Sequence, residues 1–198
     1  MSLRAKALGC IASELNAMGI GWALIGGVAL SAYGIERTSR DIDIAINMAD
    51  EGATAAFADA LRARGHTVVR APHERLGEIV LVHPHSSEPG PLGVLIDLLP
   101  RACGFEAELI AAAREITIGG VPVPVACIGH LIAFKVKAMH DVHRARDRSH
   151  LRALLGLASE EEREVAREAL RLSLRRGVLR ADEPFALLNR YLDAAGCE

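Results

Sequence analysis

Hydrophobic and polar residues along the first 126 positions alternate between helical spacing and short apolar runs, as in a sheet packed with helices. Leu8, Ile11, Leu15 and Met18 recur at helical spacing, which predicts an amphipathic helix over 3–18 that packs on the sheet. Short apolar or alternating runs predict strands at 22–25, 41–46, 66–70, 78–83 and 93–100, and a hairpin over 115–125. Helices are predicted at 28–35, 50–64 and 104–114.

From Ile128 onward the pattern is helical, over 128–141, 146–156, 160–176 and 184–195. We therefore expect an α+β (α/β) fold, in which a mixed sheet packed with helices is followed by a C-terminal helical subdomain. The predicted boundary divides residues 1–126, the sheet core, from residues 127–198. A chain of 198 residues, 51% of them hydrophobic, is long enough for one domain with such an appendage.

The most informative stretch runs from Trp22 to Asn47. A short apolar run is interrupted by Gly26-Gly27 and continues as a predicted helix, which indicates a strand that turns through glycines into a helix. In the next strand Asp41 and Asp43 share one face, because alternate residues of a strand point the same way. Two such carboxylates repel each other unless a cation, most simply a divalent metal, lies between them. The alternative is a tight turn beside a solvated edge strand.

A third carboxylate stands in the middle of an apolar run, VLIDLL, at Asp97. An isolated carboxylate in a buried strand is costly unless it has a partner or a metal. Asp97 is therefore predicted to join the same site. The alternative is an aspartate that binds neighbouring backbone at the end of a strand.

These residues resemble the signature of the nucleotidyltransferase superfamily related to DNA polymerase beta. Ile25-Gly26-Gly27 is followed by thirteen residues and then by Asp41-Ile42-Asp43. Within this stretch RTSRDID resembles the AbiEii-like toxin branch, and Arg37 and Ser39 occupy its matched positions. The resemblance implies a nucleotidyltransferase-type mixed sheet and an enzyme that transfers NMP from an NTP with release of pyrophosphate.

The resemblance also implies the roles of individual residues. Asp41, Asp43 and Asp97 are the implied catalytic and metal-binding residues, and would hold two Mg²⁺ ions. The implied nucleotide-binding residues are Gly26, Gly27, Arg37, Ser39 and Lys135. For the glycines the physical reason is the close approach of phosphate to backbone N–H groups at the start of a helix.

Residues 131–147 resemble a helix of AbiEii-like proteins in which a lysine faces the active site and a basic segment leads into Asp-x-x-Asp. By this match Lys135 contacts the triphosphate, with Lys137 as a substitute, and Asp147 orients basic groups. The sequence has His150 where the second aspartate of the motif is expected. The alternative for Lys135 is a surface lysine with a partly covered stem.

Charge divides the chain at the predicted boundary. Residues 127–180 carry a net charge of +5 and the remainder −7, which is compatible with a nucleic acid or nucleotide phosphate on the helical side. Part of this charge is predicted to form ion pairs four residues apart on one helix rather than a binding surface. The residues concerned are Arg163, Arg167, Arg171 and Arg175 with Glu160, Glu164 and Glu168.

The uncharged run from Met18 to Ile35 contains five glycines, so we predict a strand, turn and helix there instead of a membrane span. No charged segment followed by a cleavage site marks a signal peptide, and Cys10, Cys103, Cys127 and Cys197 are widely spaced. These features predict a cytoplasmic protein with free thiols and no membrane partner.

The resemblance implies an RNA acceptor, such as a tRNA 3′ end, and an antitoxin protein as regulator. Two alternatives remain open at this stage. One is a nucleotidyltransferase that modifies a small hydroxyl compound, such as an aminoglycoside or lincosamide antibiotic. The other is a catalytically inactive nucleotide-binding module of the same fold.

Overall fold

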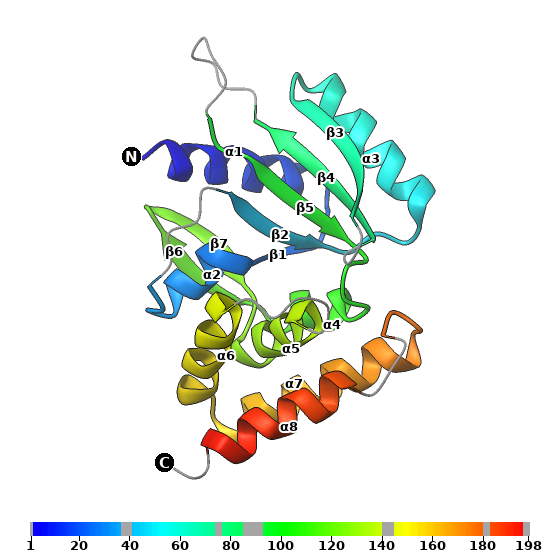
Figure 1. The fold of residues 1–198 in the computed structure, drawn as a ribbon. Helices are drawn as coiled ribbons and strands as arrows, with labels where there is room; N and C mark the ends of the chain where they lie inside the picture. The colour runs from blue at the N-terminus through cyan, green and yellow to red at the C-terminus, as the bar shows by residue number, and fades with distance from the viewer. Residues whose placement is uncertain are drawn as a thin grey trace.

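The computed structural model describes residues 2–36, 41–73, 77–84, 93–139, 145–179 and 183–195. Its strands form one seven-stranded sheet in the order β3-β4-β5-β2-β1-β7-β6 (Figure 1). The strands are β1 (Trp22–Ile25), β2 (Ile42–Ile46), β3 (Thr67–His73), β4 (Gly77–His83), β5 (Ile96–Pro100), β6 (Arg114–Ile118) and β7 (Val121–Val125). The helices are α1 (Leu3–Ala17), α2 (Gly26–Ala32), α3 (Glu51–Ala63), α4 (Glu106–Ala111), α5 (Ile128–Met139), α6 (Ala145–Leu157), α7 (Glu160–Arg175) and α8 (Glu183–Ala195).

The sheet is mixed, as predicted. Strand β2 lies at its centre, antiparallel to β1 and parallel to β5, and β1 is also parallel to β7. Parallel neighbours need a long crossover connection, and the chain between β2 and β5 contains α3 and the antiparallel pair of β3 and β4. The alternative of an edge strand for residues 41–46 is therefore wrong, because both sides of β2 are paired.

The helices are divided between the sheet and a separate group. Helix α1 packs against β7, and α3 packs against β3. Helices α5 to α8 gather on one side of the sheet (Figure 1). The buried apolar residues of both groups, from Leu8 in α1 to Leu192 in α8, belong to one hydrophobic core. Within the described ranges no helix is long and apolar enough to cross a membrane.

Local signals explain most element boundaries. Helix α3 begins where Asp50 accepts a hydrogen bond from the N–H of Ala53 at 2.7 Å, and it ends before Gly65, whose φ is +89°. Two predicted elements are shorter in the structure by more than two residues. Strand β5 starts at Ile96 instead of 93, because Gly93 has a φ of +62° that no strand residue adopts.

Helix α4 spans 106–111 instead of 104–114. Gly104 has a φ of +78°, which a right-handed helix excludes. Oε1 of the buried Glu106 accepts hydrogen bonds from the N–H groups of Cys103 (2.6 Å) and Gly104 (3.2 Å), so the helix is capped just before it begins. At the other end, Arg114 already belongs to β6.

The helical group is attached to the sheet through a buried carboxylate. Oε1 of Glu162, in α7, accepts from Arg114 of β6 at 2.6 Å, and Oε2 accepts from the N–H of Gly129 in α5 at 2.6 Å. A second attachment joins Arg176, after α7, to Glu108 of α4 through two hydrogen bonds. A β-carbon on Gly129 would overlap the α7 backbone at Glu162, so α5 and α7 pack closely at this point.

Candidate active site

Asp43 and Asp97 lie side by side at the centre of the sheet. They are register partners in the parallel pair of β2 and β5, so their side chains project from the same face. The flanking residues Ile42, Ile44, Ile96 and Leu98 are fully buried on the opposite face, whereas both aspartates are half-buried. The apolar alternation of the two strands thus places two carboxylates together on the less buried face.

The glycine turn closes against this pair. Gly26 follows β1 with a φ of +62°, and a β-carbon at that position would overlap the side chain of Asp43. The N–H of Gly27 donates a hydrogen bond to Oδ2 of Asp43 at 3.3 Å. Glycine is required at 26 both for its backbone conformation and for the close approach of the carboxylate. The predicted strand, turn and helix is confirmed, since α2 begins at Gly26.

Asp97 is the carboxyl group whose environment favours its neutral form. Burial is the main cause, and the negative charges of Asp43 and Asp41 are the next, of a rise in the pKa of Asp97 to about 6. Its Oδ1 is buried and has no hydrogen-bond partner among the residues that the structure describes. The alternative of an aspartate bound to neighbouring backbone is therefore not supported at this oxygen atom.

The chemistry of this pair suits a hard divalent cation. Mg²⁺ prefers carboxylate oxygens, and it commonly takes one or two protein carboxylates together with substrate phosphates. In the described part of the chain no three His, Cys, Asp or Glu side chains gather closely enough to hold a metal ion together. Asp43 and Asp97 thus fit a cation that a phosphate substrate also binds. The participation of Asp41, which lies just before β2, stays a prediction.

A strand, glycine turn and short helix beside paired strand carboxylates is the arrangement that the sequence resemblance implies. A profile of the AbiEii nucleotidyl transferase toxin of type IV toxin–antitoxin systems matches residues 12–189. The chain belongs to this family. It is a nucleotidyltransferase, an enzyme that transfers a nucleoside monophosphate and releases pyrophosphate.

Solved structures share the fold of this AbiEii-family chain. The antibiotic-resistance factor ANT(2″)-Ia, in a solution structure, is 20% identical with a TM-score of 0.56, over 85% of this chain and 91% of that chain. An antigenic nucleotidyltransferase-like protein from Paracoccidioides brasiliensis is 15% identical with a TM-score of 0.51, over 93% and 97% of the two chains. At these identities the likeness concerns the fold alone. No curated protein matches the chain by sequence.

Lys135 of the nucleotidyltransferase is largely buried and ion-paired. Its Nζ lies 2.7 Å from Oδ1 of Asp147, with 13% of the lysine side chain and 22% of the aspartate side chain exposed. The ion pair and the low exposure favour an engaged lysine over the alternative of a solvated surface lysine. The pair links α5 to α6, which fits an orienting role for Asp147, while the contact of Lys135 with triphosphate stays a prediction. His150, one turn after Asp147, is buried in the helical group.

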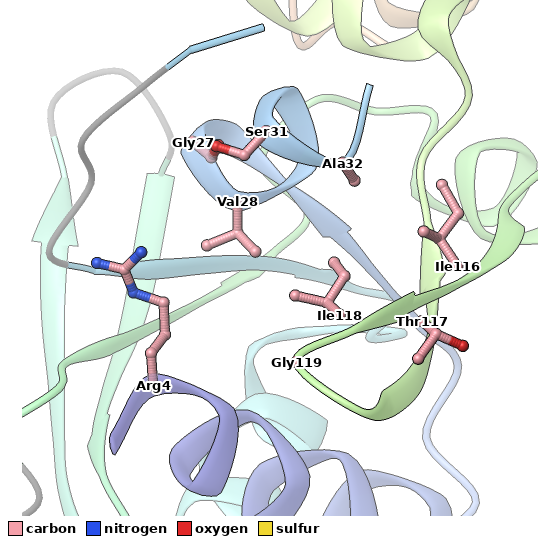
Figure 2. A pocket seen from close by; sticks show the side chains of 9 residues that line it. All are labelled: Arg4, Gly27, Val28, Ser31, Ala32, Ile116, Thr117, Ile118 and Gly119. Carbon is pink, nitrogen blue, oxygen red and sulfur yellow. The ribbon is translucent and has the colours of Figure 1, made fainter. Parts of the chain in front are cut away.

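Two predicted nucleotide-binding residues, Arg37 and Ser39, lie outside the described residues. The sequence missed a further feature, a cavity of about 400 Å³ whose lining includes Gly27 (Figure 2). Arg4 of α1 and part of β6 line it, together with α2. Nothing in the amphipathic pattern of residues 3–18 distinguishes Arg4 from an ordinary surface residue, so sequence reasoning offered no signal for it.

Proposed function

We propose that this nucleotidyltransferase moves an NMP from an NTP to the 3′ hydroxyl of an RNA, such as a tRNA, in a magnesium-dependent reaction in the cytoplasm. The observation that carries the proposal is the pairing of Asp43 with Asp97 against Gly26-Gly27. The family's designation as the toxin of a toxin–antitoxin system supports an antitoxin protein as regulator. The RNA acceptor rests on the resemblance of RTSRDID to AbiEii-like toxins.

The carboxylates hold the cation and move the proton. Asp43 and Asp97 would bind Mg²⁺, with Asp41 as a further ligand for a two-ion site. When bound, Mg²⁺ neutralises charge on the triphosphate and lowers the pKa of the attacking hydroxyl. Oδ1 of Asp97 takes the proton of the acceptor hydroxyl, since it is buried and has no hydrogen-bond partner in the described ranges.

The remaining residues position the triphosphate. Gly26 and Gly27 leave room for the β- and γ-phosphates near backbone N–H groups, and Arg37 and Lys135 supply positive charge. Ser39 donates a hydrogen bond to phosphate. In this arrangement the acceptor oxygen forms a bond to the α-phosphorus, the bond from the α-phosphorus to the bridging oxygen breaks, and the electron pair leaves on pyrophosphate. Catalysis comes chiefly from positioning and charge neutralisation.

The test is transfer of label from each of the four α-³²P-labelled NTPs, with Mg²⁺, onto total RNA and onto a panel of aminoglycosides and lincosamides. We expect label on RNA, and we expect it to fall at least about a hundredfold in Asp43→Asn, which removes a charge from the pair. The matched control is Asp59→Asn, an exposed aspartate of α3 that forms an ion pair with Arg62. This variant should keep the transfer rate.

Each other outcome contradicts a part of the proposal. Label on a drug and none on RNA would make the chain an antibiotic-modifying enzyme, which the shared fold with ANT(2″)-Ia allows. Equal labelling by Asp43→Asn and the unaltered chain would show that the carboxylate pair is not part of the active site. No transfer, together with no binding of Mg²⁺ and NTP by calorimetry, would leave an inactive module of the same fold.

A further inference from the structure

The segment that leads into α5 is hydrogen-bonded to both ends of the glycine-turn segment. The N–H of Ala126 donates to the carbonyl oxygen of Leu24 in β1 at 2.9 Å. The carbonyl oxygen of Ala126 accepts from the hydroxyl group of Tyr33 at 3.0 Å, and Tyr33 directly follows α2. In the chain, Leu24 and Tyr33 lie on either side of Gly26-Gly27. Ala126 therefore holds both the strand and the helix that flank the glycine turn.

The first turn of α5 is held by Glu162 of α7. Oε2 of this carboxylate accepts a hydrogen bond from the N–H of Gly129 at 2.6 Å, and Oε1 accepts from Arg114 of β6 at 2.6 Å. The first N–H groups of a helix have no partner within the helix, and they attract negative charge. A β-carbon on Gly129 would lie 2.4 Å from the carbonyl oxygen of Glu162, so the two helices are in close backbone contact here. The start of α5 is thus fixed to α7 and, through Arg114, to the sheet.

Lys135 lies on the same helix, six residues after Gly129. At 1.5 Å per residue, Lys135 is about 9 Å farther along the helix axis. Because a helix moves as a rigid element over such a length, the start of α5 sets where Lys135 lies. A shift or a rotation of α5 would change the distance between Lys135 and the glycine turn. It would also move Asp147, whose Oδ1 lies 2.7 Å from Nζ of Lys135.

The contacts of Glu162 and Tyr33 are polar and directed. Only 10% of the Glu162 side chain is exposed, and a buried charge often stabilises a protein no more than apolar residues of the same size would. What a satisfied polar network adds is one defined arrangement of the elements that it joins. These contacts therefore suit a function in which the placement of α5 matters more than its stability.

We propose that Tyr33 and Glu162 are positioning residues that set the distance between Lys135 and the glycine turn, and that they thereby control the affinity for the triphosphate of the NTP. The proposal rests on the proposed function, in which the glycine turn and Lys135 bind the triphosphate. Both residues act through the backbone of the chain instead of touching the substrate. Tyr33 acts through the carbonyl group of Ala126, and Glu162 acts through the N–H of Gly129.

The first measurement is calorimetric binding of inorganic tripolyphosphate, with Mg²⁺, to the full chain. This probe carries the triphosphate without a base or a sugar, and its binding needs no acceptor. Glu162→Gln should weaken the binding about tenfold, because an amide cannot accept both hydrogen bonds, and Tyr33→Phe about threefold, because only a hydroxyl group is lost. In the transfer reaction both variants should raise the KM for NTP by similar factors, with kcat and the KM for RNA within about twofold of the unaltered chain.

Arg176→Gln is the matched control, since it removes another attachment of the helical group. Arg176 follows α7 and donates hydrogen bonds to Glu108 and to the carbonyl oxygen of Gly104, and these contacts do not involve α5. The melting temperature of this variant should fall, while its affinity for tripolyphosphate stays that of the unaltered chain. An equal loss of affinity in Arg176→Gln and Glu162→Gln would overturn the inference. Thermal unfolding checks that every variant is folded at the temperature of the assay.

Lys135→Met provides the decisive comparison, because it keeps most of the stem and removes the charge. By itself it should weaken tripolyphosphate binding about tenfold. In this background Glu162→Gln and Tyr33→Phe should have no further effect, since the group that they position is gone. A merely structural role would give the same fold loss with and without the Lys135 charge, and that result would overturn the inference.

The outcomes separate this inference from the proposed function. Unchanged tripolyphosphate binding in both Tyr33→Phe and Glu162→Gln would overturn the inference, even if the unaltered chain labels RNA. Absence of tripolyphosphate binding by the unaltered chain would overturn it as well. Binding that depends on Tyr33, Glu162 and Lys135, without transfer of label to RNA, would uphold the inference and refute the RNA acceptor.

Discussion

At the scale of single residues, the candidate site depends on Gly26, Asp43 and Asp97. Gly26 must lack a side chain so that Asp43 can lie against the turn. Asp97 must keep a carboxyl group in surroundings that disfavour its charge. Each requirement lowers the stability of the free protein slightly, which is common where a site is built to bind a charged ligand.

Gly26→Ala should abolish nucleotidyl transfer and lower the free energy of unfolding by more than about 2 kcal/mol. An L residue at positive φ costs about 1–2 kcal/mol by itself, and the new β-carbon must also displace Asp43. Gly34→Ala is the matched control, because Gly34 has a φ of +79° with open space around it. It should lose about 1 kcal/mol and keep activity. Equal activity in the two variants would show that the function of Asp43 does not require its close approach to Gly26.

Asp97 should make the metal-free protein less stable as the pH rises. The pKa of Asp97 is raised to about 6, so the folded chain holds this proton more tightly than the unfolded chain does. The stabilisation is complete below about pH 4, the usual range of the group, and is lost as the pH rises through about 6. The loss should be about 1 kcal/mol, less than the full shift implies, because solvent screens a half-buried carboxyl.

Denaturant unfolding of the unaltered chain and of Asp97→Asn, without metal and between pH 4 and 8, measures this effect. The variant lacks the titrating group, so it should gain stability relative to the unaltered chain across that range and exceed it at pH 7. Mg²⁺ should stabilise the unaltered chain at pH 7 more than at pH 5, because protons compete for Asp97. A stability difference that does not vary with pH would contradict the raised pKa.

At the scale of elements, the structure explains which charged residues of the helical group are engaged internally. Four arginines of α7 form ion pairs with glutamates of the same helix, so these arginines are largely neutralised. The partners are three or seven residues apart instead of the predicted four, because the two sets of residues are offset by three positions along the helix. Glu162 of the same helix differs from its neighbours because it is buried and accepts hydrogen bonds from Gly129 of α5 and Arg114 of β6. The helical periodicity of α7 identified the arginines and glutamates that pair with each other, but it could not identify the contacts of Glu162 with other elements.

Glu162→Gln should lower the free energy of unfolding by about 2 kcal/mol, since an amide cannot accept hydrogen bonds from both Arg114 and Gly129 as a carboxylate does. The melting temperature should fall by about 4–8 °C for a chain of this length. Glu161→Gln changes the adjacent, exposed glutamate and should shift stability by less than about 0.5 kcal/mol. Similar losses in both variants would indicate a general effect of charge on α7.

At the scale of the whole molecule, the predicted boundary at 126/127 separates the sheet from helices that nevertheless share its core. Buried residues of β1, β2, β5, α5 and α7 belong to one apolar cluster. Elements that share a core usually unfold together. We therefore propose that residues 1–126 and 127–198 are parts of one cooperative unit, although the chain passes from one to the other only once.

Scanning calorimetry of the full chain should show one unfolding transition, with equal calorimetric and van't Hoff enthalpies. Glu162→Gln should lower the temperature of that transition without splitting it, because the apolar contacts between the two parts remain. Two separate transitions, in either the unaltered chain or the variant, would show that the parts fold independently and would favour two domains.

The sequence by itself determined the elements and the chemistry of the central stretch. Local periodicity decides which residues of a strand or helix share a face, and glycine, aspartate and proline act on the backbone next to them. This is why the turn at Gly26, the cap at Asp50 and the strand positions of Asp43 and Asp97 could all be predicted. The start of α4 was less predictable, because the backbone conformation of Gly104 and the hydrogen bonds of the Glu106 side chain decide it together.

Only the tertiary structure decided which distant residues meet. Asp43 and Asp97 become partners because β5 pairs in parallel with β2, a register that packing of the whole core selects. The same holds for Lys135 with Asp147 across two helices, and for Arg4 of α1, which lines the same cavity as Gly27. Periodicity carries no information about contacts between elements, since these depend on the order of strands in the sheet and on the shapes that fill its two faces.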